Sequence, residues 1–342
     1  LKNLETVNLL FMFTNIVIWY TIQWHNTYKS KYLFIVASSI TLVGLIKPSE
    51  IIIVLIPVLW KVTSKESWKK KISLIKEHKK QFFTAIAICF FIALPQVLYW
   101  IIKTGFPLYD TYKNPGVGLD VFAPHIIDSL FSYRKGWLIY TPVMIFALVG
   151  FIFLYKKEKV VFFPFATYFL LSFYLITSWT EWWYGAAFSN RPLIATYPVL
   201  AISLGYFLNY IKEKSSTVKF LVFTVILFFT FLNQFQWWQM KNYILDPYRT
   251  TKEYYWANFL KTKKADNSES LLLMQRDFSG KMIFSDKSNY QSSVLMNENF
   301  DNFPKDTRGS EENIARDSTN SFYKVTTQTE YALTKKVRYN KL

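Results

Sequence analysis

The chain alternates long apolar blocks with short charged loops as far as residue 236, and polar residues dominate after that point. A helix needs about 20 apolar residues to cross the hydrocarbon core of a bilayer, and most of the blocks approach that length. The pattern predicts a mainly α-helical, polytopic transmembrane bundle over residues 1–236, with about eight spans. The expected spans are 8–24, 32–46, 51–60, 82–102, 137–155, 160–178, 194–211 and 218–236.

Two of these blocks, 32–46 and 51–60, are short and flank the sequence Lys47-Pro48-Ser49-Glu50. Proline disfavours helix in the residue before it and interrupts the helical hydrogen bonds. The two blocks therefore form either a short hairpin with Lys47 and Glu50 at its tip or one long helix that is broken midway. Irregular backbone at membrane depth must be enclosed by protein or line a wet cavity, so both side chains should face polar surroundings or an interface.

Three lysine-rich loops set the expected orientation. Residues 61–81 carry eight lysines against two glutamates, and the loops 156–159 and 211–219 are also basic. All three fall on the same side of alternating spans, and basic loops remain in the cytoplasm. The loops 103–136 and 179–192, and everything after Gln236, should then lie outside the cytoplasm.

The basic loops also account for the net charge of +17. Lysines beside a span attract anionic lipid head groups, by about 1 kcal/mol each. The lipid bilayer is therefore an expected partner, and nucleic acid is not. For residues 61–81, a regulatory or partner-binding role is the alternative to this anchoring role.

Residues 237–342 are rich in Asn, Ser, Asp, Lys and Thr, which predicts a separate extracytoplasmic, soluble segment. Strand-like patterns at 270–274, 281–284 and 322–333 indicate that it contains β-structure. The last pattern stops at the end of the sequence, so we expect an incomplete domain. Both ends of the chain read as cut from a longer protein.

The residues that usually hold metals or disulfides are scarce. Cys89 is the single cysteine, and His25, His78 and His125 are far apart in the sequence. No pair of these histidines has metal-ligand spacing, so no metal site is predicted. No cofactor signature is evident either, although the sequence leaves a requirement for a divalent metal open.

The loop 179–192 concentrates three tryptophans, Tyr184, Glu181 and Arg191 between two spans. An aromatic belt at the membrane interface is one interpretation. The density of rings beside Gly185 favours a second one, in which Trp182, Trp183 and Tyr184 form the wall of a sugar or acceptor site. Small residues there allow a ligand to approach the backbone closely.

Four cations can reach the outer face: Lys47, Arg134, Lys135 and Arg191. Such side chains bind phosphate or pyrophosphate through charge-assisted hydrogen bonds. The alternative for each is snorkelling to the interface. We predict that Arg191, which lies between aromatic residues and the proline that opens the next span, contributes most to a lipid-phosphate site.

The predicted outer face has no paired carboxylates of the kind that general acid–base catalysis uses. Its single carboxylates are Glu50, Asp110, Asp120, Asp128 and Glu181. Glu181 has the best setting for a catalytic base, but it can equally neutralise Arg191. The catalytic residue thus remains unassigned, with Glu181 as a weak candidate.

Three segments resemble the polytopic glycosyltransferases of the GT-C class, in particular family 39, which includes the protein O-mannosyltransferases and aminoarabinose transferases. Gly44-Leu-Ile-Lys-Pro-Ser-Glu-Ile is similar to that family's Gly-Leu-x-x-Lys/Arg-Pro-Thr segment, and Leu130-Phe-Ser-Tyr-Arg-Lys-Gly-Trp to its entry into a span after an external helix. Trp182-Trp-Tyr-Gly-Ala-Ala-Phe-Ser-Asn-Arg-Pro resembles its Trp-Tyr-Gly-Gly-x-x-Gly-x-Arg-Pro loop, with Ala186 and Ser189 at places that glycine often holds.

This resemblance implies a membrane enzyme that moves a sugar from a polyprenyl-phosphate donor to a protein, lipid or glycan acceptor at the outer face of a bacterial inner membrane. In that class the catalytic carboxylate lies in the first external loop. We expect it before Leu1, which would make this chain a fragment that is inactive alone. A transporter or flippase for a lipid-linked glycan, or a structural subunit of such a pathway, is the alternative.

Overall fold

The computed structural model describes residues 6–108 and 117–273, together with four short strands between residues 307 and 335. The chain divides into two compact units, Leu1–Tyr109 with Val121–Leu272, and Asp110–Asp120 with Leu273–Leu342. The first unit is helical and contains every candidate site residue. The predicted boundary at residue 236 stays a prediction, but the first unit extends beyond it to Leu272.

The first helices form the hairpin that the sequence left as one of two options. α1 (Thr6–Thr27) packs against α2 (Ser30–Ile46), which is followed by the 3-10 helix η1 (Pro48–Val54) and by α3 (Leu55–Leu59). Lys47 is extended, with φ −152° and ψ 105°, as expected for a residue before proline. η1 folds back on α2 so closely that a Cβ on Gly44 would lie 2.9 Å from Ile51 Cδ1.

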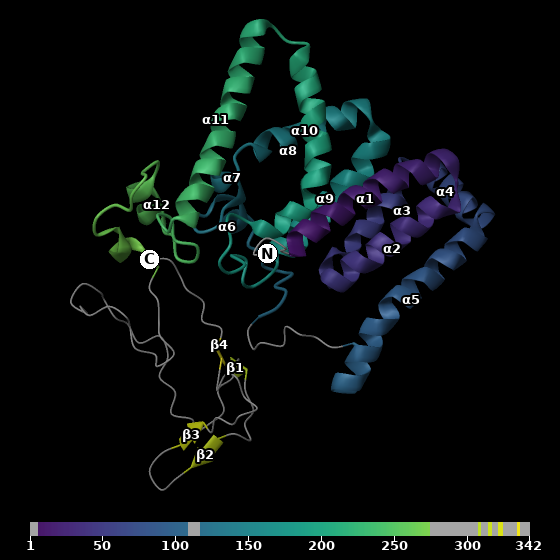
Figure 1. Cartoon of the computed structure of the whole chain (residues 1–342), viewed down its shortest axis with the longest axis horizontal. Coiled ribbons are helices and arrows are strands. Elements are labelled where there is room, and N and C mark those ends of the chain that lie inside the picture. The colour runs from purple at the N-terminus through teal and green to yellow at the C-terminus, as the bar shows by residue number, and fades with distance from the viewer. Residues whose placement is uncertain are drawn as a thin grey trace. The chain divides into compact units, whose positions relative to one another are not determined.

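α4 (Lys65–Glu77) and α5 (Lys79–Thr104) follow. α4 begins at a capping box formed by Ser64 and Ser67, and its buried Lys71 donates hydrogen bonds to the Pro57 and Trp60 carbonyl oxygens at 2.7 and 3.4 Å. α5 packs against α2 and ends at Gly105 in the left-handed conformation. In Figure 1, α5 leads away from the other helices toward the bottom of the view.

The predicted span 137–155 is interrupted. After α6 (Ile126–Phe131), the chain forms the short α7 (Trp137–Tyr140), breaks at Thr141-Pro142, and continues as α8 (Met144–Lys157). Pro142 cannot supply the backbone N–H that a continuous helix needs, and it forces Thr141 out of the helical region. The break places the Thr141 side chain in a cavity described below.

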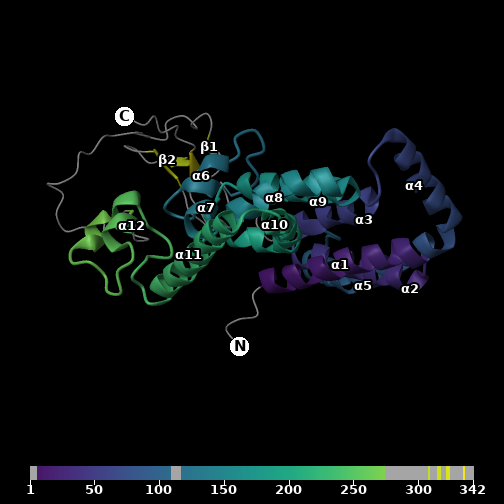
Figure 2. The ribbon, with the colours of Figure 1, turned by 90° about the horizontal axis from the view of Figure 1, so that it is seen from above.

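The remaining helices complete the first unit. They are α9 (Lys159–Thr177), the 3-10 helix η2 (Arg191–Thr196), α10 (Tyr197–Lys212), α11 (Ser216–Lys241), α12 (Lys252–Asn258) and the 3-10 helix η3 (Ser268–Leu271). α8 and α10 pack so tightly that a Cβ on Gly150 would lie 2.1 Å from the Ser203 carbonyl oxygen. Figure 2 shows α1, α2 and α5 on one side of the group and α3, α8 and α9 on the other.

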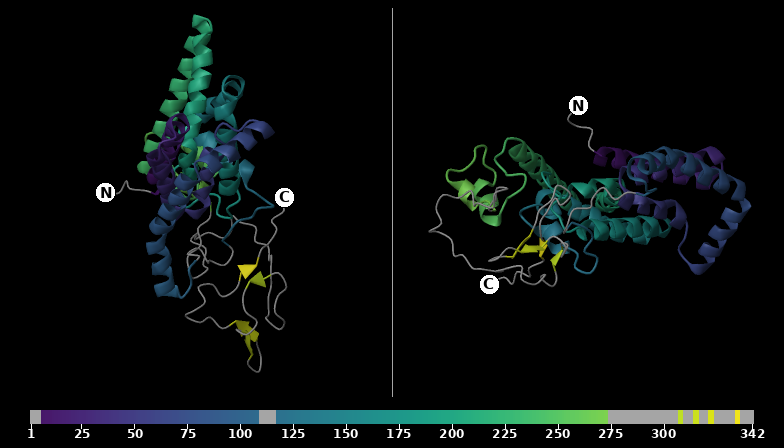
Figure 3. Two further views of the ribbon diagram at one scale, coloured as in Figure 1. Left: turned by 90° about the vertical axis from the view of Figure 1, so that its right-hand side faces the viewer. Right: turned by 90° about the horizontal axis from the view of Figure 1, so that it is seen from below.

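Five of the described helices are long and apolar enough to cross a membrane. They are Thr6–Thr27, Lys79–Thr104, Lys159–Thr177, Arg191–Lys212 and Ser216–Lys241, and the shorter apolar segments are Ser30–Ile46 and Pro48–Leu59. This confirms a mainly helical chain with several segments able to span a membrane. The count of eight spans stays a prediction. Figure 3 (left) shows the α10–α11 turn and α5 projecting in opposite directions.

The described strands are short. β1 (Thr307–Arg308) pairs antiparallel with β4 (Thr334–Lys335), and β2 (Ile314–Arg316) pairs antiparallel with β3 (Ser321–Tyr323). β3 overlaps the start of the strand predicted at 322–333, whereas the strand predicted at 281–284 lies outside the described residues. At 270–274 the expected strand is wrong where the chain is described, because η3 includes residues 270 and 271.

Candidate functional site

The segment 179–190, called the aromatic loop below, connects α9 to η2. Three of its residues have positive φ, namely Tyr184 at 48°, Gly185 at 65° and Ser189 at 53°. An added Cβ on Gly185 would meet no atom within 4 Å, so this glycine serves the backbone conformation and not a close approach. These bends direct the neighbouring side chains toward different parts of the protein.

Trp182 and Trp183 contact different partners. The Trp182 ring lies 6.3 Å from the His125 ring, and the backbone N–H of His125 donates to the Thr177 carbonyl oxygen at 2.8 Å. The Trp183 ring lies under the guanidinium of Arg134, whose Cζ is 4.1 Å from the ring centroid. Arg134 Nε also donates to the Tyr248 carbonyl oxygen at 2.7 Å. The two tryptophans thus hold the loop against the segments before α6 and α7.

Tyr184 points inward. Its hydroxyl donates to the Ile176 carbonyl oxygen at 2.7 Å, and burial together with the nearby Glu50 carboxylate raises its pKa. Each of these three residues, Trp182, Trp183 and Tyr184, therefore contacts a different part of the protein. The prediction that they form one wall of a sugar or acceptor site stays untested, and their contacts favour a role in positioning the loop.

Lys47 and Glu50 form an ion pair at the turn of the first hairpin. Lys47 Nζ lies 2.8 Å from Glu50 Oε1, and the Glu50 side chain is 3% exposed. The other oxygen, Oε2, has no hydrogen-bond partner among the described residues. Both side chains thus face a polar partner, as the sequence predicted, but the partner of Lys47 is a carboxylate within its own turn.

Lys135 is buried, and its Nζ donates to the Ala187 carbonyl oxygen and, at 2.5 Å, to that of Pro247. Burial, with the positive charges of Arg134 and Arg191 nearby, lowers its pKa to about 7. These contacts favour a role in tying the aromatic loop to the segment after α11 over the predicted role in binding phosphate. Because the charges of Arg134 and Arg191 both act on the Lys135 ammonium, these three cations lie near one another.

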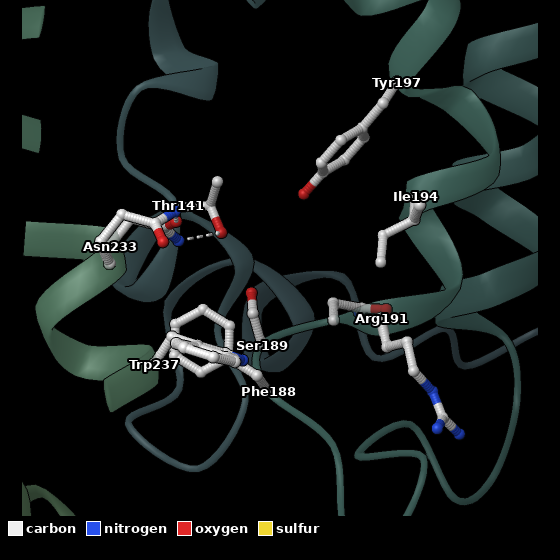
Figure 4. A pocket seen from close by; sticks show the side chains of 10 residues that line it. Thr141, Phe188, Ser189, Arg191, Ile194, Tyr197, Asn233 and Trp237 are labelled. Atoms are coloured by element: carbon white, nitrogen blue, oxygen red, sulfur yellow. Dashed lines mark hydrogen bonds between the residues drawn. The ribbon is translucent and has the colours of Figure 1, made fainter. Parts of the chain in front are cut away.

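A cavity of about 250 Å³ opens beside Arg191. Its lining comes from the α7–α8 break, from the end of the aromatic loop with η2 and α10, and from α11; the residues are Thr141, Phe188, Ser189, Asn190, Arg191, Ile194, Tyr197, Asn233, Gln234 and Trp237. In Figure 4 the hydroxyls of Thr141, Ser189 and Tyr197 point into the cavity, while the Arg191 guanidinium extends away from them. Arg191 therefore stands at the edge of a neutral, polar cavity.

Several buried polar atoms on this lining have no protein partner. Ser189 Oγ and both side-chain amide atoms of Asn190 have no hydrogen bond within the described part of the chain, although these residues are only 6% and 2% exposed. Leaving such a group unpaired costs about 1–3 kcal/mol. These three atoms are shielded from the cavity as well as from solvent, so they mark imperfect local pairing at its wall.

The role of Arg191 in binding a lipid phosphate stays a prediction, and the sequence did not indicate most of the other residues that line the cavity. One signal was available, because Asn233 and Gln234 are polar residues inside an apolar span, where such residues usually mark function. The weak base candidate, Glu181, is exposed, and its charge acts on Arg134. It is not part of the cavity lining.

In the described ranges, no cluster of three or more His, Cys, Asp or Glu side chains could hold a metal ion. The need for a metal or cofactor stays untested. Comparisons with protein-family models, curated proteins and solved structures gave no match.

Proposed function

We propose that this chain is part of a membrane glycosyltransferase of the GT-C type, similar to family 39. The enzyme moves a sugar from a polyprenyl-phosphate donor to an acceptor. The observation that carries this proposal is the polar cavity with aromatic flanks beside Arg191. Ligand sites combine aromatic surface with a few convergent polar groups in this way. An adjacent arginine adds a group suited to phosphate.

The surrounding helices support a lipid-linked donor. Arg191 opens a helical segment long and apolar enough to cross a membrane, so in this proposal the cavity lies at one end of that segment and close to lipid. In this proposal the basic loops lie in the cytoplasm, and this end faces the extracytoplasmic side of a bacterial inner membrane. In this proposal Arg191 binds the phosphate, and Arg134 and Lys135 raise the local positive potential. Lys47, at the hairpin turn beside Glu50, also contributes to phosphate binding.

The test is a transfer assay on the full-length protein in nanodiscs, with undecaprenyl-phosphate-linked mannose and aminoarabinose as donors. Release of undecaprenyl phosphate is measured by mass spectrometry. Arg191→Ala should abolish release while resistance to alkaline extraction from membranes is unchanged. Arg191→Lys should also be impaired, because an ammonium cannot reproduce bidentate binding by a guanidinium.

Arg249→Ala provides the matched control. Arg249 lies in the segment after α11 and pairs with Asp246 at 3.6 Å, outside the cavity lining. The Arg249→Ala substitution removes the same charge as Arg191→Ala, and it should leave the release of undecaprenyl phosphate near the wild-type rate. Unchanged release by Arg191→Ala would contradict the role given to Arg191, and no release by the wild-type protein from either donor would contradict the proposed function.

A further inference from the structure

One face of α4 carries an exposed row of large apolar side chains, called the apolar stripe below. It consists of Trp68, Ile72 and Ile75, which are spaced by four and three residues and therefore share one face of the helix. These side chains are 42%, 40% and 36% exposed. A contiguous apolar surface of this kind on a charged helix usually marks a place where lipid or another protein binds.

The orientation of α4 about its own axis is fixed by contacts on a different face. The Lys71 side chain is buried, and its Nζ donates to the Pro57 carbonyl oxygen and lies 2.7 Å from His25 Nε2 on α1. Leu74, three residues further along, packs against the buried cluster around Trp24. The apolar stripe cannot turn into the protein without breaking these contacts, so it stays directed outward.

The charges of α4 are distributed unequally around the stripe. Lys65, Lys69 and Lys76, called the lysine edge below, follow from the helical repeat as the residues that border the stripe on the side away from the buried Lys71 face. Both acidic residues of the helix, Glu66 and Glu77, fall on the opposite face by the same repeat. The outer border of the stripe is therefore basic, and its charge is complementary to an anionic surface.

The position of α4 in the chain keeps it close to a candidate span. α4 ends at Glu77, and α5, which is long and apolar enough to cross a membrane, begins at Lys79. The ends of a spanning helix lie at the lipid head groups, so α4 is held within reach of them. In Figure 2, α4 slants steeply across the direction of α1 and α2, as a helix lying along the membrane surface would.

We propose that α4 binds an anionic membrane surface, with the apolar stripe inserted at the boundary between head groups and acyl chains and the lysine edge in contact with acidic head groups. Amphipathic helices with lysines on the polar face and bulky apolar residues on the other bind lipid in this way. Tryptophan, present here as Trp68, prefers this depth. The proposal goes beyond the transferase activity and does not depend on it.

The proposal is tested by electron paramagnetic resonance of the full chain in nanodiscs. Cys89 is the single cysteine, so a Cys89→Ala background allows one nitroxide label at a chosen position. A label at Ile75→Cys reports on the apolar stripe, and a label at Ser73→Cys reports on a face directed away from it. In discs of equal parts phosphatidylcholine and phosphatidylglycerol, the label at position 75 should collide more with dissolved oxygen than with a water-soluble nickel chelate. The label at position 73 should show the reverse, because oxygen concentrates in the acyl chains and the chelate stays in water.

Two adjacent lysines provide a matched pair for the charge. Lys69→Gln removes a charge from the lysine edge, whereas Lys70→Gln removes one from the face that carries the glutamates. Lys69→Gln should lower the ratio of inserted to water-exposed label at position 75 about fivefold, which is the contribution expected from one lysine at an anionic surface. Lys70→Gln should leave this ratio at its starting value. Both lysines are exposed, so neither substitution should unfold α4.

Trp68→Gln tests the apolar contribution. It should lower the same ratio by roughly tenfold or more, since a large aromatic side chain would no longer be buried in lipid. Ser73→Gln, at an exposed position on another face of the helix, is the control and should have little effect. An unchanged ratio in Trp68→Gln would overturn the placement of the apolar stripe in the membrane.

Three further results would overturn the proposal. The first is a label at position 75 that meets the nickel chelate as often as the label at position 73. The second is equal insertion in discs of pure phosphatidylcholine, because the lysine edge would then have no role. The third is shielding of position 75 from both oxygen and the chelate, which would indicate that a protein covers the stripe. Release of undecaprenyl phosphate reports separately on the transferase, so insertion of α4 without any release would retain this proposal alone.

Discussion

Replacing Lys135 with methionine tests how the outer segments of the first unit are held together. Lys135 is 2% exposed, and its ammonium donates hydrogen bonds to the carbonyl oxygens of Ala187 and Pro247. Methionine fills a similar volume but leaves both carbonyls without this donor, at a cost of about 1–3 kcal/mol each. The substitution also removes the unfavourable burial of a positive charge, which opposes that loss.

The opposing effects separate with pH. The folded-state pKa of Lys135, about 7, is below its ordinary value of 10.5. Between these values the unfolded chain binds more protons than the folded protein, so wild-type stability should rise with pH by up to about 1.4 kcal/mol per unit. The stability difference between wild type and Lys135→Met should therefore grow by roughly 2–3 kcal/mol from pH 7.5 to 9.5.

The assay is SDS-driven unfolding in mixed micelles, followed by tryptophan fluorescence at both pH values. Lys252→Met at the exposed start of α12 is the control, and its difference from wild type should be the same at pH 7.5 and 9.5. A difference for Lys135→Met that stays constant with pH, or shrinks as pH rises, would refute the assigned burial and bonding of this lysine.

Substitutions at three glycines test the helix packing and the backbone conformation. Gly150→Ala should lower the thermal midpoint and separate α8 from α10, because the new Cβ would lie 2.1 Å from a backbone oxygen; Gly205→Ala on α10, which has open space around it, should be neutral or stabilising. Gly185→Ala should destabilise the aromatic loop by about 1–2 kcal/mol, owing to its positive φ, and Gly185→Asn should recover part of that loss in the same SDS-unfolding assay. Equal midpoints for Gly150→Ala and Gly205→Ala, or for Gly185→Ala and wild type, would contradict these assignments.

The helical character of the chain and the turn at Lys47–Pro48 could be predicted because both depend on local sequence. Long uncharged blocks indicate spans, and a proline constrains the residue before it. The same local rule applied to Pro142 indicates the break after α7, but the continuous apolar pattern at 137–155 concealed it. Local sequence signals thus predicted the helical segments but not the break within residues 137–155.

The candidate site was less predictable because its parts are distant in the sequence. The contacts of Lys135 lie 52 and 112 residues further along the chain. A lysine beside an arginine in an outer loop gives the same sequence signal whether it is buried or exposed. The cavity likewise joins Thr141, Asn190 and Trp237, which come from three elements, and no spacing rule brings those residues together.

The small number of buried residues in α5 and α11 bears on how the protein is made. Both are among the most apolar candidate spans, and few of their residues are buried against other helices. Each can therefore leave the translocon sideways into lipid as soon as it is synthesised. α3, with five residues, and α8, with fourteen, are too short to do so alone, and they must wait for α9 and α10. We expect the cavity to close late in biogenesis, after α11 has left the ribosome and brought Asn233 and Trp237 to Thr141.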